Sequence, residues 1–112
     1  MFSFEKWFII LKKFLQNDTE LFYELKIIGD SMFPTFIEGE IVRVKYKKID
    51  DIDIGDILVF SHSFTNFTIH RVIEKKILNG NITFVTKGDN NSFEDNYFIN
   101  DDKILGVVNV NE

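Results

Sequence analysis

The chain contains no cysteine and a single proline among its 112 residues. The absence of cysteine excludes thiol catalysis, thiolate zinc sites and disulfides. Basic charge is also scarce, because 13 Lys and Arg stand against 18 Asp and Glu and leave a net charge of −5. A protein of this charge is not expected to bind nucleic acid. Since there are only two histidines, a metal site would depend on carboxylates, and we expect no metal or other cofactor.

A long apolar run is missing as well. The longest wholly apolar run, from Trp7 to Leu11, falls far short of the 20 or so residues that a membrane-spanning helix needs. The N-terminal segment also lacks the small-residue cleavage site of a secretion signal. We therefore expect a cytoplasmic protein, with peripheral attachment to a membrane as the alternative.

The N-terminal segment does show helical periodicity. Charged and amide side chains lie mostly opposite its apolar residues, which recur at helical spacing: Phe4, Trp7, Phe8, Leu11, Phe14 and Leu15. This pattern predicts an amphipathic helix within residues 1–20. We favour packing of its apolar face on the rest of the protein, while contact with a membrane surface or a protein partner is the alternative.

Residues 21–112 are predicted to form one domain with a modest core. Asn79-Gly80 is the dipeptide favoured in type I′ turns and predicts a long hairpin. So many strands in a short chain indicate a mainly β fold, either a coiled antiparallel sheet or a small open barrel. The segments with strand-like patterns are 22–28, 41–46, 57–60, 67–78, 81–87 and 104–110.

Three separated segments carry residues suited to acyl transfer. Segment 29–35 (GDSMFPT) contains Ser31, segment 69–73 (IHRVI) contains His70, and segment 86–91 (TKGDNN) contains Asp89, with Asp95 six positions further on. A serine hydroxyl becomes nucleophilic when a base takes its proton, and a third group commonly orients that base. Histidine is well suited to act as a base near neutral pH. Together these residues favour a serine protease, with either aspartate as the acid.

The residues around the serine constrain the backbone. Gly29 allows a sharp turn, and Pro34 restricts Phe33 to extended conformations, so that backbone N–H groups near Ser31 can face a developing oxyanion. The alternatives are an ordinary turn serine and a hydrogen-bonded core histidine. His62 lies in a polar stretch that we expect to be a loop without a catalytic role.

The order of these segments and their amino-acid sequences resemble those of the type I signal peptidase family, within the wider class of LexA-like and signal-peptidase-like serine proteases. The resemblance covers about residues 25–110. Bacterial members have lysine at the position of the histidine in IHRVI. The histidine makes this segment similar to that of the endoplasmic-reticulum and archaeal-like branch. That branch also has an aspartate six residues after the one in Gly-Asp-Asn, as Asp95 follows Asp89 here.

The resemblance implies a fold of the signal peptidase and LexA C-terminal type over residues 21–112. It also implies Ser31, His70 and Asp95 as the catalytic set, with Asp89 either the rival acid or a structural residue. The implied function is a serine endopeptidase that removes a leader or signal peptide from a peptide or preprotein substrate. A non-enzymatic peptide-binding module and a partner-dependent protease subunit are the alternatives.

The same resemblance implies where the substrate binds. Gly29 lies where a second donor to the oxyanion is expected, next to the backbone N–H of Ser31. Met32 and Phe33, followed by Pro34, are expected to line a groove for an extended substrate with small side chains before the cut.

Overall fold

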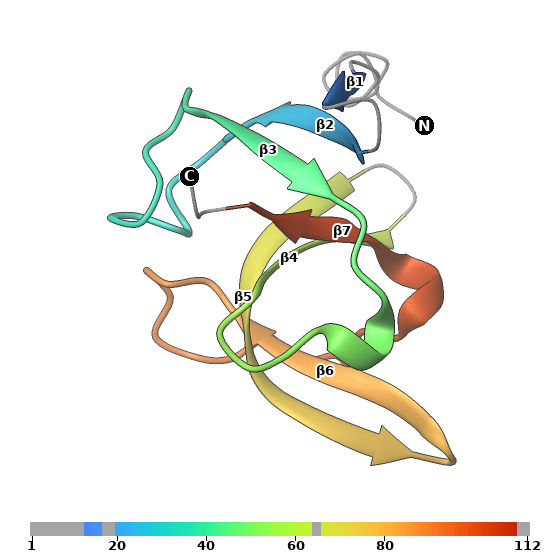
Figure 1. Ribbon diagram of the computed structural model, residues 1–112. Helices are drawn as coiled ribbons and strands as arrows, with labels where there is room; N and C mark the ends of the chain where they lie inside the picture. Colours follow the sequence, from blue (N-terminus) through green and yellow to red (C-terminus); the bar gives the residue numbers. More distant parts are fainter. Residues whose placement is uncertain (1–12, 17–19, 64–65, 110–112) are drawn as a thin grey trace.

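The computed structural model describes residues 13–16, 20–63 and 66–109, which form a strand-rich body (Figure 1). Helical backbone in these ranges is limited to two short 3-10 turns. In chain order, the elements are β1 (Lys13–Gln16), β2 (Glu20–Lys26), β3 (Ile41–Lys45), η1 (Ile49–Asp51), β4 (Ile57–Ser63), β5 (Asn66–Leu78), β6 (Asn81–Lys87), η2 (Asp101–Lys103) and β7 (Ile104–Val108).

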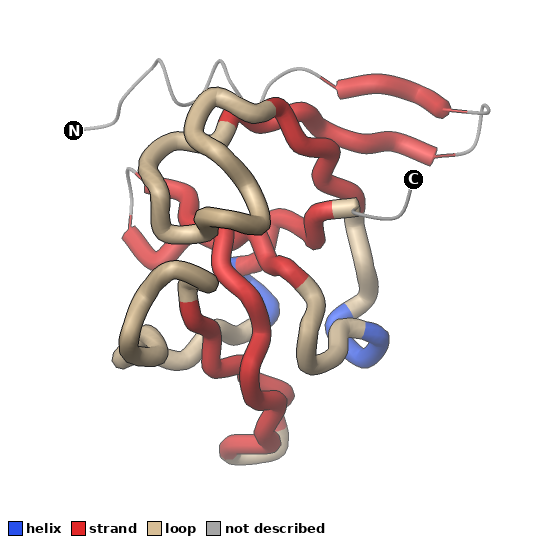
Figure 2. The backbone as a smooth tube through the Cα atoms, turned by 90° about the vertical axis from the view of Figure 1, so that its left-hand side faces the viewer, coloured by secondary structure: helices blue, strands red, loops and turns tan. Residues whose placement is uncertain are grey.

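All the strands belong to one antiparallel sheet with the order β1-β2-β3-β7-β4-β5-β6. The last strand in the sequence therefore lies between β3 and β4. The sheet coils, and β5 and β6 extend away from the body as a hairpin (Figures 1 and 2). Within the described ranges β1 and β6 are the two edges and do not pair with each other, so the sheet stays open. The predicted mainly β, coiled antiparallel architecture is confirmed.

The predicted N-terminal helix is wrong at its C-terminal end. Lys13–Gln16 is a strand, in which Lys13 pairs with Tyr23 and Gln16 with Glu20. Antiparallel pairing with β2 satisfies backbone groups across the ladder, and such pairing overrides a helical side-chain pattern in so short a segment. Residues 1–12, which carry the rest of the predicted helix, lie outside the described residues.

The predicted hairpin is confirmed at its turn. Asn79 and Gly80 both have positive φ, at 53° and 82°, as a type I′ turn requires. Asn81–Lys87 forms β6 with the predicted bounds. The expectation of a loop around His62 is wrong, because β4 continues through this position to Ser63.

The core has two halves, one on each side of β4. Ile57 and Val59 lie in the first half and Leu58 and Phe60 in the second, and all four side chains are almost fully buried. Because successive strand residues point to opposite faces, β4 is covered on both. Each such side chain contributes about 1.5–3 kcal/mol through burial.

The pairing of β7 with β3 leaves no room for a side chain at position 106. A Cβ on Gly106 would lie 2.5 Å from the carbonyl oxygen of Lys45 and 3.0 Å from Cγ1 of Val44. Glycine at this position therefore permits the close approach of the two strands.

Gly106→Ala is expected to lower the free energy of unfolding by about 3 kcal/mol, because the new methyl group would push β3 and β7 apart. Urea denaturation followed by circular dichroism measures the change. Gly80→Ala is the matched control: its Cβ would meet open space, so the cost is that of a positive φ, about 1 kcal/mol. Equal urea midpoints for the two variants would contradict the close approach.

Candidate active site

Ser31 lies in the loop 27–40 between β2 and β3. Backbone hydrogen bonds close the base of this loop, from Ile27 N–H to the Glu40 carbonyl and from Gly39 N–H to the Ile27 carbonyl, both 2.8 Å. Phe36 is buried in the first half of the core and donates its N–H to the Met32 carbonyl. The loop that carries the serine is therefore closed at its base and anchored in the core.

His70 lies on β5 with its side chain only 9% exposed. Its Nε2 is 3.2 Å from Oγ of Ser31, and its Nδ1 is 2.7 Å from Oδ2 of Asp95. A carboxylate only accepts hydrogen bonds, so Nδ1 carries the proton and Nε2 is left to accept the serine hydroxyl. The arrangement is that of a nucleophile, a base and an acid in a row.

Asp95 is held beside His70 by the strand that precedes it. Its backbone N–H donates to the Thr86 carbonyl at 2.8 Å, and the hydroxyl of Thr86 donates to its Oδ2 at 2.7 Å. Phe84 and Ile99 exchange backbone hydrogen bonds, which fold the segment 88–98 back along β6. The carboxylate is thus fixed at both its backbone and its side chain.

Asp89 binds Arg71 rather than the histidine. The guanidinium donates twice, from Nε to Oδ1 at 2.9 Å and from Nη2 to Oδ2 at 2.8 Å. The hydroxyl of Thr35 donates to the same carboxylate. The hydrogen bonds from Arg71 lower the pKa of Asp89 and raise that of Arg71, against the opposing effect of burial on each.

The segment after β6 also binds the serine loop through its backbone. Asn90 N–H donates to the Ser31 carbonyl at 2.8 Å, and the Asn90 side-chain amide donates to the Asp30 carbonyl at 3.1 Å. The N–H of Asp89 points to Sδ of Met32 at 3.3 Å. The two segments lie on the same side of the sheet, at the left of Figure 1.

The residues expected to bind substrate fall into two groups. Gly29 and Pro34 are exposed, as is Phe33, with nearly half of its surface accessible. Their contact with substrate stays a prediction. Met32, by contrast, is 3% exposed and belongs to the core, so it has almost no surface to offer a groove. An unbranched apolar side chain in a loop fits a core anchor as well as a groove.

Two aromatic residues, Phe60 and Tyr97, lie near the histidine and its acid. Phe60 makes edge contacts with His70 and with Tyr97, at ring-centroid separations of 6.4 and 6.2 Å. Burial raises the pKa of Tyr97 to about 12, and the charge of Asp95 acts in the same direction. The phenol is therefore neutral throughout the neutral pH range.

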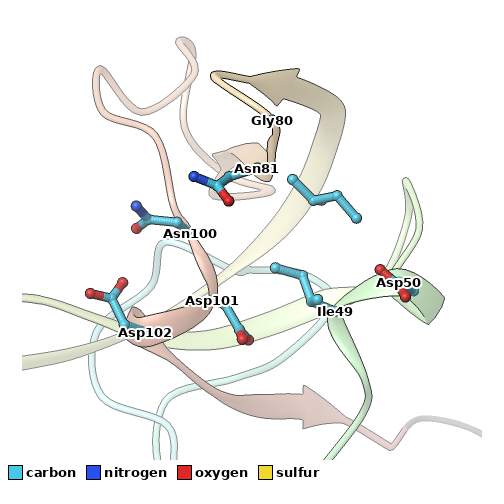
Figure 3. Close-up of a pocket in the computed structure, with 8 residues that line it drawn as sticks. Ile49, Asp50, Gly80, Asn81, Asn100, Asp101 and Asp102 are labelled. Atoms are coloured by element: carbon cyan, nitrogen blue, oxygen red, sulfur yellow. The ribbon is translucent and has the colours of Figure 1, made fainter.

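A shallow pocket lies away from this site, between η1, the β5–β6 turn and η2 (Figure 3). Its lining includes the carboxylates of Asp50, Asp101 and Asp102 but no serine, histidine or lysine. No cluster of potential metal ligands was found in the described part of the chain. Nor does any helix there have the length and apolar character to cross a membrane.

Sequence reasoning gave little weight to three residues around the site: Thr35, Arg71 and Thr86. Arg71 forms an ion pair with Asp89. Thr86 gave no signal of its own, because a β-branched residue in an apolar strand is ordinary. Its position directly before Lys-Gly-Asp-Asn was the available clue.

The family model described as Peptidase S24-like matches residues 3–109. The chain belongs to the Peptidase S24-like family. It is 29% identical over 84 residues to "Signal peptidase I W" of Bacillus subtilis (strain 168), an alignment that covers 73% of this chain and 44% of the relative. It is 40% identical over 73 residues to "Signal peptidase complex catalytic subunit SEC11C" of Homo sapiens, covering 62% of this chain and 37% of the relative.

These relatives confirm the resemblance to signal peptidases within the LexA-like class and support a signal-peptidase-like serine protease. The chain spans less than half of the length of either relative. No solved structure matches the chain.

Asp89→Asn is expected to lower the free energy of unfolding by about 1 kcal/mol at neutral pH, a value reduced by solvent screening of the partly exposed pair. The hydrogen bonds from Arg71 hold the folded-state pKa of Asp89 below its ordinary value of 3.8. Its contribution is therefore fully present above that pH and is lost as the pH falls through the folded-state pKa. Urea denaturation between pH 7 and pH 2.5 should show the two proteins converging below about pH 4.

Asp53→Asn is the control for this series. Asp53 has a side chain 74% exposed and a longer contact of 3.4 Å to Lys75. Its substitution should change stability little at any pH. A constant difference between wild type and Asp89→Asn down to pH 2.5 would show that the ion pair with Arg71 does not supply the stabilisation.

Proposed function

We propose that the chain is a serine endopeptidase that removes a leader or signal peptide through an acyl-enzyme. The observation that carries the proposal is the continuous hydrogen-bonded row from Ser31 through His70 to Asp95. The engagement of Asp89 with Arg71 supports Asp95 as the acid. Membership of a peptidase family supports the same reaction class.

In the proposed reaction, Oγ of Ser31 attacks the scissile carbonyl carbon while Nε2 of His70 takes the hydroxyl proton. The oxyanion accepts hydrogen bonds from the backbone N–H of Ser31 and a neighbouring donor near Gly29. The C–N bond then breaks as Nε2–H gives its proton to the leaving amine. Water attacks the acyl ester, gives a proton to Nε2 and releases the acid, and the proton returns to Oγ. Asp95 holds the imidazole and balances the charge of the imidazolium.

An extended peptide is the proposed substrate form. At Thr68 and Ile69, β4 is the only described strand that pairs with β5, since β6 pairs from Arg71 onward. Backbone groups just before His70 therefore lie beyond the end of the β6 ladder, where a peptide can add as a further strand. The family resemblance supports small side chains before the cut. Phe33 and Pro34, two and three residues after the serine, are both exposed.

Two other functions stay open. A non-enzymatic peptide-binding module would use the same edge without bond cleavage. A catalytic subunit that depends on a partner is consistent with one relative, which is named as a subunit of a signal peptidase complex. The cytoplasmic location and any contact through residues 1–20 remain predictions from the sequence, which cell fractionation and co-purification would test.

Ser31→Ala and His70→Ala should each abolish cleavage, because each removes a reacting group. The protein should stay folded, since neither side chain belongs to the two halves of the hydrophobic core. The first measurement is a comparison of protein N-termini in cells that express wild type or Ser31→Ala at equal levels. His62→Ala is the matched histidine control and should leave the profile unchanged. Identical N-termini for wild type and a folded Ser31→Ala protein would favour the binding module.

The two aspartates are separated by matched substitutions. Asp95→Asn should lower kcat on a peptide spanning an identified cleavage site by about a thousandfold or more, because the amide no longer fixes the tautomer of His70. Asp89→Asn should lower kcat by less than about tenfold, because the Asp89 carboxylate does not contact the imidazole. We expect this smaller loss to follow from the lower stability of the variant. A larger loss for Asp89→Asn than for Asp95→Asn would assign the acid role to Asp89.

A further inference from the structure

We propose that Thr86 is a positioning residue for the catalytic acid, acting through its hydroxyl on Asp95; this inference rests on the proposed protease function. Thr86 is fully buried and lies on β6, directly opposite Val72 of β5. His70 is two residues before Val72 and therefore lies on the same face of the sheet. The register thus places Thr86 diagonally beside the proposed base, on the side from which Asp95 approaches.

The contacts of Thr86 explain how it acts. It binds Asp95 twice, once through its backbone carbonyl and once through its hydroxyl. Oδ2 of the carboxylate receives both the Thr86 hydroxyl and Nδ1 of His70, each at 2.7 Å. Two donors on one oxygen fix the rotation of the carboxylate. They also share its charge, so the hydroxyl limits how strongly the carboxylate attracts the proton of the imidazole.

Three ionisable neighbours of this row, Tyr97, Arg71 and Asp89, keep their protonation state through the neutral range. The phenol of Tyr97 stays protonated because burial raises its pKa to about 12. Arg71 and Asp89 stay charged, since their ion pair raises the pKa of one and lowers that of the other. Lys87, next to Thr86 on β6, donates to the Gly88 carbonyl. A pH effect of changing Thr86 therefore reports on the His70–Asp95 pair.

Thr86→Val removes the hydroxyl while keeping a branched side chain and the backbone carbonyl. On a peptide spanning an identified cleavage site, kcat should fall about tenfold while KM stays within about twofold. With one donor fewer, the carboxylate favours the protonated imidazole, so the acid limb of the kcat profile should move to higher pH. The Nδ1–H proton resonance of His70 should also move downfield, because its hydrogen bond to Asp95 strengthens.

Two further variants separate positioning from packing. Thr86→Ser restores the hydroxyl and should return the pH profile and the resonance to wild type, with a lower unfolding midpoint from the lost methyl group. Thr83→Val is the matched control on the same strand. The hydroxyl of Thr83 is also buried, but it has no hydrogen-bond partner among the described residues, so its removal should leave both readouts unchanged.

A Thr86→Val protein with the wild-type pH profile and Nδ1–H resonance would overturn the inference. So would equal changes in Thr86→Val and Thr83→Val, because they would indicate strand packing alone. The resonance is measured on the full chain without substrate. It therefore decides the role of Thr86 on Asp95 even if wild type cleaves no peptide, an outcome that would refute the proposed protease function separately.

Discussion

The site depends on hydrogen bonds between two loops that are distant in sequence. The backbone N–H of Asn90 binds the carbonyl of Ser31 itself, and the adjacent Asp89 carboxylate accepts the hydroxyl of Thr35 from the far side of the same loop. Arg71 ties that carboxylate to β5, next to His70. The segment after β6 therefore binds the serine loop directly. Through Arg71 it also links that loop to β5, the strand that carries His70. These contacts therefore act together with the core anchoring of Met32 and Phe36 to set the distance between Oγ and the imidazole.

β4, which is buried on both faces, joins the two halves of the core that support the site. On one side it meets the half of the core that contains Met32 and Phe36 of the serine loop. On the other it meets the half that contains Phe84 and Ile99, which bracket Asp95. One strand therefore supports the proposed nucleophile and the proposed acid from opposite faces. Close packing in both halves resists small displacements, which matter because a hydrogen bond at 3.2 Å weakens quickly with distance and angle.

Sequence alone predicted those features that depend on neighbouring residues. Asn79-Gly80 defines its own turn through local φ preferences, and β6 follows from the β-branched and aromatic residues that come soon after it. The strand at Lys13–Gln16 was missed because its pairing with β2 is a tertiary contact that competes with a helical side-chain pattern. The choice between Asp89 and Asp95 was likewise beyond local reasoning. It depends on Arg71 lying beside one carboxylate and Thr86 beside the other, and only the register of β5 and β6 sets those neighbours.

The two carboxylates near the histidine would be an electrostatic problem if both were unpaired. Each would favour a protonated imidazole, and a protonated imidazole cannot accept the serine proton. The bidentate ion pair with Arg71 neutralises Asp89, and the hydroxyl of Thr86 shares the charge of Asp95. What remains beside His70 is one carboxylate with a fixed orientation and a moderated charge. In the proposed mechanism such a group holds the tautomer and stabilises the imidazolium once it forms, without forming it prematurely.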